Sequence, residues 1–462
     1  KLKFLKLQGN GLQGSIPINL RACTDLLQLR LNNNFLSGSI PPQLSSFHNL
    51  ENLDLFLNEL TGGIPQGLAN CSPLKSINLG VNFLNGPIPS QLGALRLLRV
   101  LILRSNEVSG DIPKSLSNCT KLRFLSLYEN VLQGPIPSEI LTSSTRLEDL
   151  YLDSNKLNGR IPEEIGKLWK LRKLILNNNT FTGGIPTVLA NCSSLKVLAL
   201  SSTSLYGYIP AELGSLTQLE ELWLDKNSLA GSIPYSLINC TELRNMFLHH
   251  KKLVGTIPKD IGYKLPKLQK MELSFNQLSG NLPKSLGNCS ALLLLSTVEN
   301  QLSGVVPLEL GMVSSLQQIY LGRNRCKGDV LPILLNCTQL YKVAVEMNRF
   351  WGSIPLEIGL KLTKLQELSG GGNQFSGGIP KSFGNCTRLS TLALYGNQLS
   401  GVVPQELGML TDLQRLLLFE NKLSSGNSGN VPSALSLLKN LLFLDLSINK
   451  LQGSIPSEFN TL

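Results

Sequence analysis

Long apolar runs are absent from this sequence of 462 residues. The longest, at residues 291–295 and 441–444, are far shorter than the roughly 18 residues that a membrane-spanning helix requires. A secretory leader is also not recognisable, because residues 1–7 already alternate as a strand does. We therefore expect any membrane connection to run through a segment outside this sequence.

Residues that carry chemistry are equally scarce. There are three histidines, and His249 and His250 are adjacent, so on a strand they would point to opposite faces and make a poor metal pair. No nucleophile elbow or phosphate-binding glycine loop is recognisable, and the glycines at 370–372 replace strand residues. The net charge of +11 comes from scattered residues, which argues against nucleic-acid binding. We expect no metal, no cofactor and no enzyme activity in these residues.

What the sequence does contain is a repeat, shown by residues 219–243, LEELWLDKNSLAGSIPYSLINCTEL. A module of this size cannot bury its own apolar face and must stack on copies of itself. The position of Asn227 holds Asn in seventeen of nineteen repeats, where an inward amide can bond backbone groups of its own and neighbouring coils. We call this series the asparagine ladder. Its positions are Asn10, Asn34, Asn58, Asn82, Asn106, Asn130, Asn155, Asn179, Thr203, Asn227, Lys251, Asn276, Asn300, Asn324, Asn348, Asn373, Asn397, Asn421 and Asn449.

A Gly-x-Ile-Pro element follows most ladder positions, as at residues 231–234. Glycine permits a left-handed turn and proline fixes an extended exit, so the element turns the chain away from the strand. The segment after it is too short for more than one or two helical turns. Each coil is therefore predicted to hold one strand, one turn and one short outer helix.

The combination LxxLxxLxLxxNxLxGxIP with a 24-residue period resembles the plant-specific class of leucine-rich repeats. The resemblance implies an α/β repeat solenoid, a right-handed twisted superhelix with a parallel β-sheet on its concave side and short outer 3-10 or α turns. It covers residues 1–462 as a single array of about 19 repeats. Because the cysteine-bearing caps of the family are missing, we expect a fragment truncated at both ends.

Arrays of this class form the ectodomains of plant leucine-rich-repeat receptor kinases and receptor-like proteins. The resemblance implies a domain on the extracellular side of the plasma membrane, in the apoplast, that belongs to a single-pass protein with a cytoplasmic Ser/Thr kinase. It implies two partners, a peptide or protein ligand and a co-receptor kinase with a short leucine-rich-repeat ectodomain. The alternative is a receptor-like or polygalacturonase-inhibitor-like defence protein that binds a pathogen enzyme, although such inhibitor arrays are typically much shorter.

Two ligand classes of the family lack support in the sequence. Steroid-binding members carry a large island between coils, whereas the largest excess here is four residues at 425–428. Members that use an Arg-x-Arg pair on a late strand recognise small peptides, but Arg415 is alone in its strand and Arg323 and Arg325 flank a ladder asparagine.

Eight of the nine cysteines recur at one position of different coils, two or three repeats apart. Two strand spacings are about 10 Å, beyond the roughly 7 Å between Cα atoms that a disulfide tolerates. We therefore expect free buried thiols, with Cys326 a further free thiol. Seven of these cysteines lie in Asn-Cys-Ser/Thr units, which recur as structural elements and are also glycosylation sequons. The predicted acceptors are Asn70, Asn118, Asn178, Asn191, Asn239, Asn288, Asn336 and Asn385.

Specific information can reside only where the repeat leaves a position free, on the outward residues of each strand. At the middle outward position, six of the seven residues from Ile102 to Phe247 are apolar or aromatic, which is typical of a contact surface. The carboxylates nearby favour an extended, partly apolar peptide with a basic group near repeats 7, 10 and 12; they are Asp149, Asp153, Glu221, Asp225 and Glu272. The predicted ligand-binding residues are Ile102, Arg104, Phe124, Tyr128, Tyr151, Ile175, Trp223, Asp225, Phe247 and His249.

Overall fold

The computed structural model describes residues 1–425 and 431–461. It divides the chain into two compact units, unit 1 (Lys1–Ala230) and unit 2 (Gly231–Leu462), each of which is described by itself. The prediction that all repeats form one array therefore stays a prediction. Most of the four-residue excess at 425–428 lies outside the described residues.

Each described coil contributes one three-residue strand to a parallel sheet, which we call the inner sheet. Aligned leucines hold the register, and Leu198 of one coil lies opposite Leu222 of the next. In unit 1 the inner strands are β1 (Phe4–Lys6), β3 (Gln28–Arg30), β5 (Asn52–Asp54), β7 (Ser76–Asn78), β9 (Val100–Ile102), β11 (Phe124–Ser126), β13 (Asp149–Tyr151), β15 (Lys173–Ile175), β16 (Val197–Ala199) and β18 (Glu221–Trp223). In unit 2 they are β20 (Asn245–Phe247), β22 (Lys270–Glu272), β24 (Leu294–Ser296), β26 (Gln318–Tyr320), β28 (Lys342–Ala344), β30 (Glu367–Ser369), β32 (Thr391–Ala393), β34 (Arg415–Leu417) and β36 (Phe443–Asp445).

A second strand follows the ladder position in most coils, and the sequence did not predict it. These lateral strands also pair in parallel, for example Gly38 opposite Leu60. In unit 1 they are β2 (Gln13–Ser15), β4 (Phe35–Ser39), β6 (Glu59–Gly63), β8 (Phe83–Pro87), β10 (Glu107–Asp111), β12 (Val131–Gly134), β14 (Lys156–Leu157) and β17 (Tyr206–Tyr208), and β19 (Ser228–Ser232) begins in unit 1 and ends in unit 2. In unit 2 they are β21 (Lys252–Val254), β23 (Ser279–Gly280), β25 (Gln301–Val305), β27 (Arg325–Gly328), β29 (Arg349–Ser353), β31 (Gln374–Gly377), β33 (Gln398–Val402) and β35 (Lys422–Ser424).

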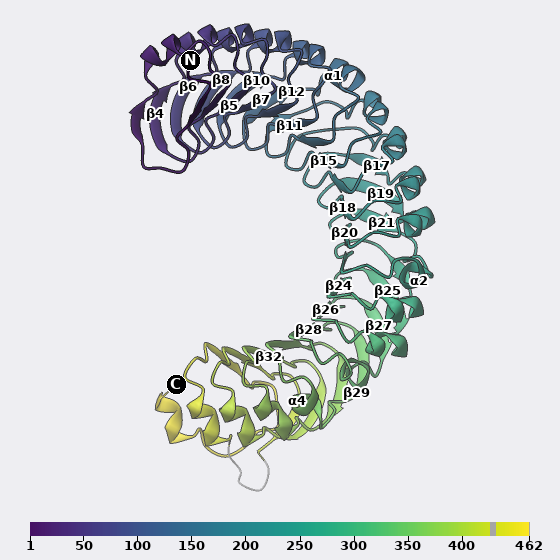
Figure 1. The fold of residues 1–462 in the computed structure, drawn as a ribbon. Helices are drawn as coiled ribbons and strands as arrows, with labels where there is room; N and C mark the ends of the chain where they lie inside the picture. Colours follow the sequence, from purple (N-terminus) through teal and green to yellow (C-terminus); the bar gives the residue numbers. More distant parts are fainter. Residues whose placement is uncertain (426–430, 462) are drawn as a thin grey trace. The chain divides into compact units, whose positions relative to one another are not determined.

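Short helical turns close each coil on the side away from the inner strands (Figure 1). Among the described turns, four are α-helical: α1 (Ser138–Ser143), α2 (Ile261–Lys264), α3 (Leu331–Leu334) and α4 (Ile358–Lys361). The 3-10 turns are η1 (Ile18–Ala22), η2 (Pro42–Ser46), η3 (Gln66–Asn70), η4 (Ser90–Ala94), η5 (Lys114–Asn118), η6 (Glu163–Lys167), η7 (Thr187–Asn191), η8 (Ala211–Ser215), η9 (Tyr235–Asn239), η10 (Lys284–Asn288), η11 (Leu308–Met312), η12 (Lys381–Asn385), η13 (Gln405–Met409), η15 (Ser433–Leu437) and η16 (Ser457–Thr461). Among the described helices, none is long and apolar enough to cross a membrane.

The asparagine ladder joins neighbouring coils as the sequence predicts. Asn58 Nδ2 donates to the carbonyl of Leu31 in the preceding coil at 3.1 Å and to that of Leu55 in its own coil at 3.1 Å. Its Oδ1 accepts from the backbone N–H of Leu36 at 3.0 Å, which holds the start of the lateral strand. The residue before the ladder position is left-handed even without glycine, as at Leu57 with φ of 53°. The ladder bonds hold the chain in this unfavourable region.

The cysteines are free thiols, as predicted. All except Cys23 are buried, and burial raises the pKa of the Cys192 thiol to about 12. The Cys326 thiol is buried as well and lies 3.7 Å from the carbonyl oxygen of Leu302. These thiols fill the interior beside the leucines as small apolar groups.

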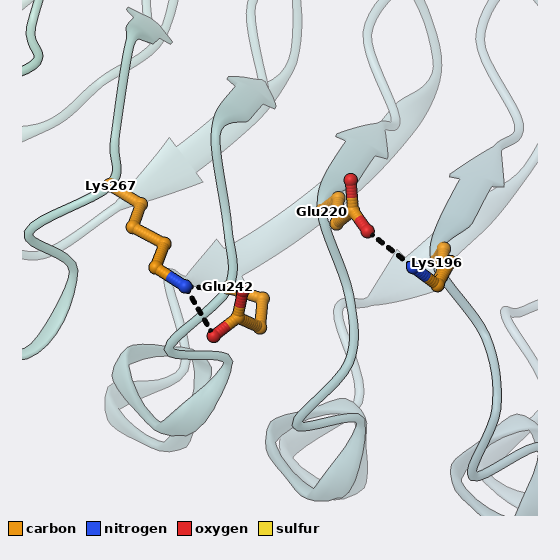
Figure 2. A network of polar contacts seen from close by, with 4 residues as sticks. All are labelled: Lys196, Glu220, Glu242 and Lys267. Atoms are coloured by element: carbon orange, nitrogen blue, oxygen red, sulfur yellow. Dashed lines mark hydrogen bonds and ion pairs between the residues drawn. The ribbon is translucent and has the colours of Figure 1, made fainter.

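Ion pairs link some coils just before the inner strands begin. Figure 2 shows Lys196 and Glu220 of unit 1, whose charged atoms lie 2.8 Å apart. It also shows Lys267 and Glu242 of unit 2, at 2.6 Å. Since these side chains are partly exposed, each pair contributes at most about 1 kcal/mol. The coils are held together mainly by their buried leucines and by the ladder.

Candidate ligand-binding surface

The inner sheet of unit 1 presents three columns of side chains that the core does not use. Strand alternation sends Leu222 inward and Glu221 and Trp223 outward, and Asp225 follows the strand in a third column. Parallel register places equivalent residues side by side, so Ile102, Ser126, Tyr151, Ile175, Ala199 and Trp223 form one continuous middle column.

An aromatic cluster occupies the part of this face formed by β11 and β13. The ring centroid of Tyr151 lies 5.4 Å from that of Phe124 and 6.3 Å from that of Tyr128. The Arg104 guanidinium lies 4.9 Å from the ring centroid of Phe56 and 5.4 Å from that of Tyr128, and its Nη1 donates to Tyr128 Oη. The structure thus brings together four predicted residues, Arg104, Phe124, Tyr128 and Tyr151. It adds Phe56, which was not predicted because it precedes the apolar stretch that begins at residue 102.

Glycine at position 80 leaves room for this arginine. A Cβ there would lie 3.0 Å from Arg104 Cγ and 3.3 Å from Ile102 Cγ2. Such contacts are tighter than side chains normally make, so a larger residue would displace Arg104. The orientation of Arg104 therefore depends on Gly80 as well as on the two rings.

Two polar groups among the aromatics have unsatisfied atoms. Ser126 Oγ and Asp149 Oδ1 are buried and make no hydrogen bond within the described parts of the chain. Desolvation raises the pKa of Asp149, against the opposing charges of Lys173 and Arg172. Desolvation also raises the pKa of Asp153 to about 6, and Glu129 adds to the shift. Ser126 Oγ and Asp149 Oδ1 are thus unpaired polar atoms that their neighbours shield from solvent, which is unfavourable.

Trp223 lies in the last inner strand of unit 1 and is half-buried. Its indole Nε1 donates to Glu221 Oε2 at 2.9 Å, which fixes the ring over the strand face. In the next column the Ser201 hydroxyl donates to Asp225. Between Tyr151 and Trp223 the column contains Ile175, which is partly exposed, and Ala199, which is buried. The sheet surface between the two aromatic rings is therefore formed by smaller apolar side chains. We call Ile102, Phe124, Tyr128, Tyr151, Ile175 and Trp223 the inner aromatic face.

Phe247 and His249 belong to unit 2. Their ring centroids lie 6.4 Å apart, and His250 stacks on Phe275 at 4.2 Å. The expectation that His249 and His250 point to opposite faces was wrong, because their rings lie only 5.2 Å apart. Both follow the end of β20, and His250 has a left-handed φ of 53°. No cluster of metal-ligating residues is present in the part of the chain that the structure describes.

An open pocket of about 450 Å³ lies beside these histidines in unit 2. Its lining includes Glu272, Ser274 and Tyr320. The Ser274 hydroxyl donates to Glu272 Oε1 at 2.7 Å, and burial is the main cause that raises the pKa of Tyr320 to about 12. Phe275, Leu294 and Val298 also line the pocket, so its lining mixes polar and apolar side chains.

The eight sequon asparagines are all exposed. Seven of them end an outer helical turn or follow one, as Asn118 does in η5, and therefore lie away from the inner sheet. Asn178 differs, because it lies in the turn after inner strand β15 with φ of 53°. A glycan at Asn178 would therefore stand at the rim of the inner sheet.

Two family models, both described as leucine rich repeat, match the chain. One matches residues 169–229 and the other residues 25–47, 49–71, 97–119, 146–168, 267–289 and 440–462. Among solved structures, the plant peptide hormone receptor RGFR1 in complex with RGF2 is 34% identical, with a TM-score of 0.92 over 100% of this chain and 76% of that chain. The chain belongs to the leucine-rich-repeat family.

Further matches place it near plant receptor ectodomains. The Arabidopsis receptor kinase HAESA, in complex with the peptide hormone IDA and the co-receptor SERK1, is 34% identical over 97% of this chain and 74% of that chain, with a TM-score of 0.91. HAESA with an N-terminally extended IDA peptide is 35% identical over 100% of this chain and 81% of that chain, with a TM-score of 0.88. A comparison with curated proteins gives no match. This leucine-rich-repeat chain is thus similar to receptor domains that recognise ligands rather than to enzymes.

Proposed function

We propose that this leucine-rich-repeat chain is an extracellular recognition domain that binds a peptide on the inner aromatic face of unit 1. The observation that carries the proposal is the middle column, in which Tyr151, Ile175 and Trp223 are partly exposed to solvent with Phe124 and Tyr128 beside them. Aromatic side chains that are held in place and open to solvent are the usual anchors of protein–peptide contacts.

The polar groups suggest the character of the peptide. Asp149 and Asp153 are partly desolvated carboxylates, so a basic group of the ligand placed beside them would relieve their unfavourable burial. We infer an extended peptide with apolar side chains and at least one Arg or Lys.

A co-receptor and a membrane-bound receptor context are part of the same proposal. HAESA was solved with both a peptide hormone and the co-receptor SERK1, and it matches 97% of this chain. A receptor kinase would carry this domain outside the cell and would use the bound peptide to recruit a second receptor. The eight exposed sequons are compatible with that environment.

The test uses a peptide selected from a library of random linear peptides on the immobilised protein. Its affinity is measured by calorimetry for the wild type and for a variant that combines Trp223→Ala and Tyr151→Ala. Loss of two aromatic anchors is expected to weaken binding by about 100-fold or more. Trp169→Ala is the matched control, because Trp169 is 54% exposed in the same unit and follows outer turn η6.

Thermal unfolding of both variants is measured to show that they fold. If the folded double variant binds the selected peptide as well as the wild type does, peptide binding at this face is refuted. Weaker binding in the Trp169→Ala variant would place the contact on the outer turns instead.

A further inference from the structure

The outer turns of unit 2 carry apolar side chains that the repeat does not require. Leu308 is 77% exposed and Met312 74%, and two coils later Leu356 is 74% and Leu360 63% exposed. The coil between them contributes the partly exposed Ile333 and Leu335. We call these six residues the outer apolar patch. Contiguous exposed apolar residues on a protein surface indicate that something covers them.

A sequon lies in the middle of this patch. Asn336, Cys337 and Thr338 follow helix α3, in the coil between the two exposed leucine pairs. Cys337 is buried, which anchors the segment, while Asn336 and Thr338 are exposed. Asn336 Nδ2 lies 3.6 Å from the position that a Cβ on Gly311 would take, directly beside Met312. The amide that would carry a sugar is therefore in contact with the coil of Leu308 and Met312.

Unit 1 offers the comparison at Asn118, which ends η5. The turns on either side present Ser90 and Ala94 in η4, and Ser138 and Thr142 in α1. These are the coil positions that Leu308, Met312, Leu356 and Leu360 hold in unit 2. The two sequons thus hold equivalent coil positions but have small or polar neighbours in one unit and large apolar neighbours in the other.

We propose that an N-linked glycan on Asn336 covers the outer apolar patch and keeps this face of unit 2 from self-association. A glycan is bulky and hydrated, and it begins here at an atom adjacent to the coil that carries Leu308 and Met312. The ring faces of its first sugars that present C–H groups lie on Leu308, Met312 and Leu356, and its hydroxyl groups face water. This role is independent of peptide binding, so it stands or falls separately from the proposed function.

The test compares protein from a glycosylating host with Thr338→Ala, which removes the sequon but keeps Asn336. Mass spectrometry of peptides establishes whether Asn336 is modified. Binding of an apolar fluorescent dye reports whether the patch is exposed, and sedimentation velocity reports whether the protein self-associates. Thr338→Ala is expected to raise dye fluorescence about two- to threefold and to cause self-association. Thr120→Ala, which removes the Asn118 sequon, is expected to change neither.

Two further variants keep the test decisive. Thr338→Ser retains the sequon and should behave as the wild type, whereas adding Met312→Lys and Leu356→Lys to Thr338→Ala should restore the wild-type dye signal. If Thr338→Ala does not fold, enzymatic removal of glycans from the folded wild type gives the same comparison. The proposal is overturned if Asn336 is unmodified, or if the intact glycoprotein already binds the dye as strongly as Thr338→Ala. It is equally overturned if the intact glycoprotein forms dimers that Met312→Lys dissociates.

Discussion

Unit 1 and unit 2 are built from the same coil but differ in the side chains at its free positions. In unit 1 the inner sheet carries Phe124, Tyr151 and Trp223. In unit 2 the equivalent strands carry Phe247 and Tyr320 together with the polar Glu272, Ser296 and Ser369, and Leu308 and Leu356 are exposed on the outer turns. The repeat fixes the interior and leaves both surfaces free to vary. Differences between the units at these free positions are therefore the best guide to function.

The largest expected effect tests whether the two units really share one scaffold. Asn82 and Asn397 are both buried and make matching bonds, since each Oδ1 accepts a backbone N–H at 3.0 Å. Asn82→Ala or Asn397→Ala leaves several buried backbone groups without a partner, so each should destabilise its unit by about 2–4 kcal/mol. Urea unfolding measures both. If only one of the two variants loses stability, the ladder has different roles in the two units.

A smaller effect separates the inner faces. Arg104 packs on Phe56 and Tyr128 in unit 1, whereas Arg415 lies 5.3 Å from the ring centroid of Phe443 in unit 2. Arg104→Ala should weaken binding of the selected peptide about tenfold, because the rings of Phe56 and Tyr128 lose the guanidinium group that packs on them. Arg415→Ala should leave the affinity unchanged. Equal losses of affinity would mean that the peptide is not confined to unit 1.

The smallest effect concerns the desolvated carboxyl of Asp153, whose pKa is raised from 3.8 to about 6. The folded state therefore holds a proton that the unfolded state has lost, and stability decreases as the pH rises through this window. Relative to the wild type, Asp153→Asn should leave the free energy of unfolding unchanged at the acidic end of this window and should increase it above pH 6. Partial exposure limits the gain to about 1 kcal/mol.

Thermal unfolding across this pH range measures the difference between Asp153→Asn and the wild type. A stabilisation that is independent of pH would exclude desolvation of Asp153 as its cause.

The periodic residues made the interior predictable. Leu222 and Leu224 are buried, Asn227 bonds two coils and Gly231 has a φ of 77°, all as the repeat indicates. The lateral strands were missed because they are held by ladder amides of the next coil, a contact between distant residues that local pattern does not reveal. The left-handed conformation of Leu57 and Val81 was missed for the same reason.

The surface was predictable only in part. Strand alternation placed Tyr151 and Trp223 on the outward face, and the structure brings Phe124, Tyr128 and Tyr151 together. Burial of Ser126 by its neighbours could not be read from an outward position in the repeat. The outer apolar patch was also missed, because the outward residues of the strands were taken as the only positions that the repeat leaves free. Such features depend on which residues from several coils meet.

The three tryptophans of the chain allow the most direct test, because each reports a different surface. Trp223 lies on the inner face of unit 1, Trp169 follows an outer turn of unit 1, and Trp351 lies on lateral strand β29 of unit 2. Hydroxyl-radical labelling is measured by mass spectrometry with and without the selected peptide. Protection of Trp223, with Trp169 and Trp351 labelled as before, is the result that peptide binding on the inner aromatic face predicts. Unchanged labelling of Trp223 with protection of Trp169 or Trp351 would contradict it.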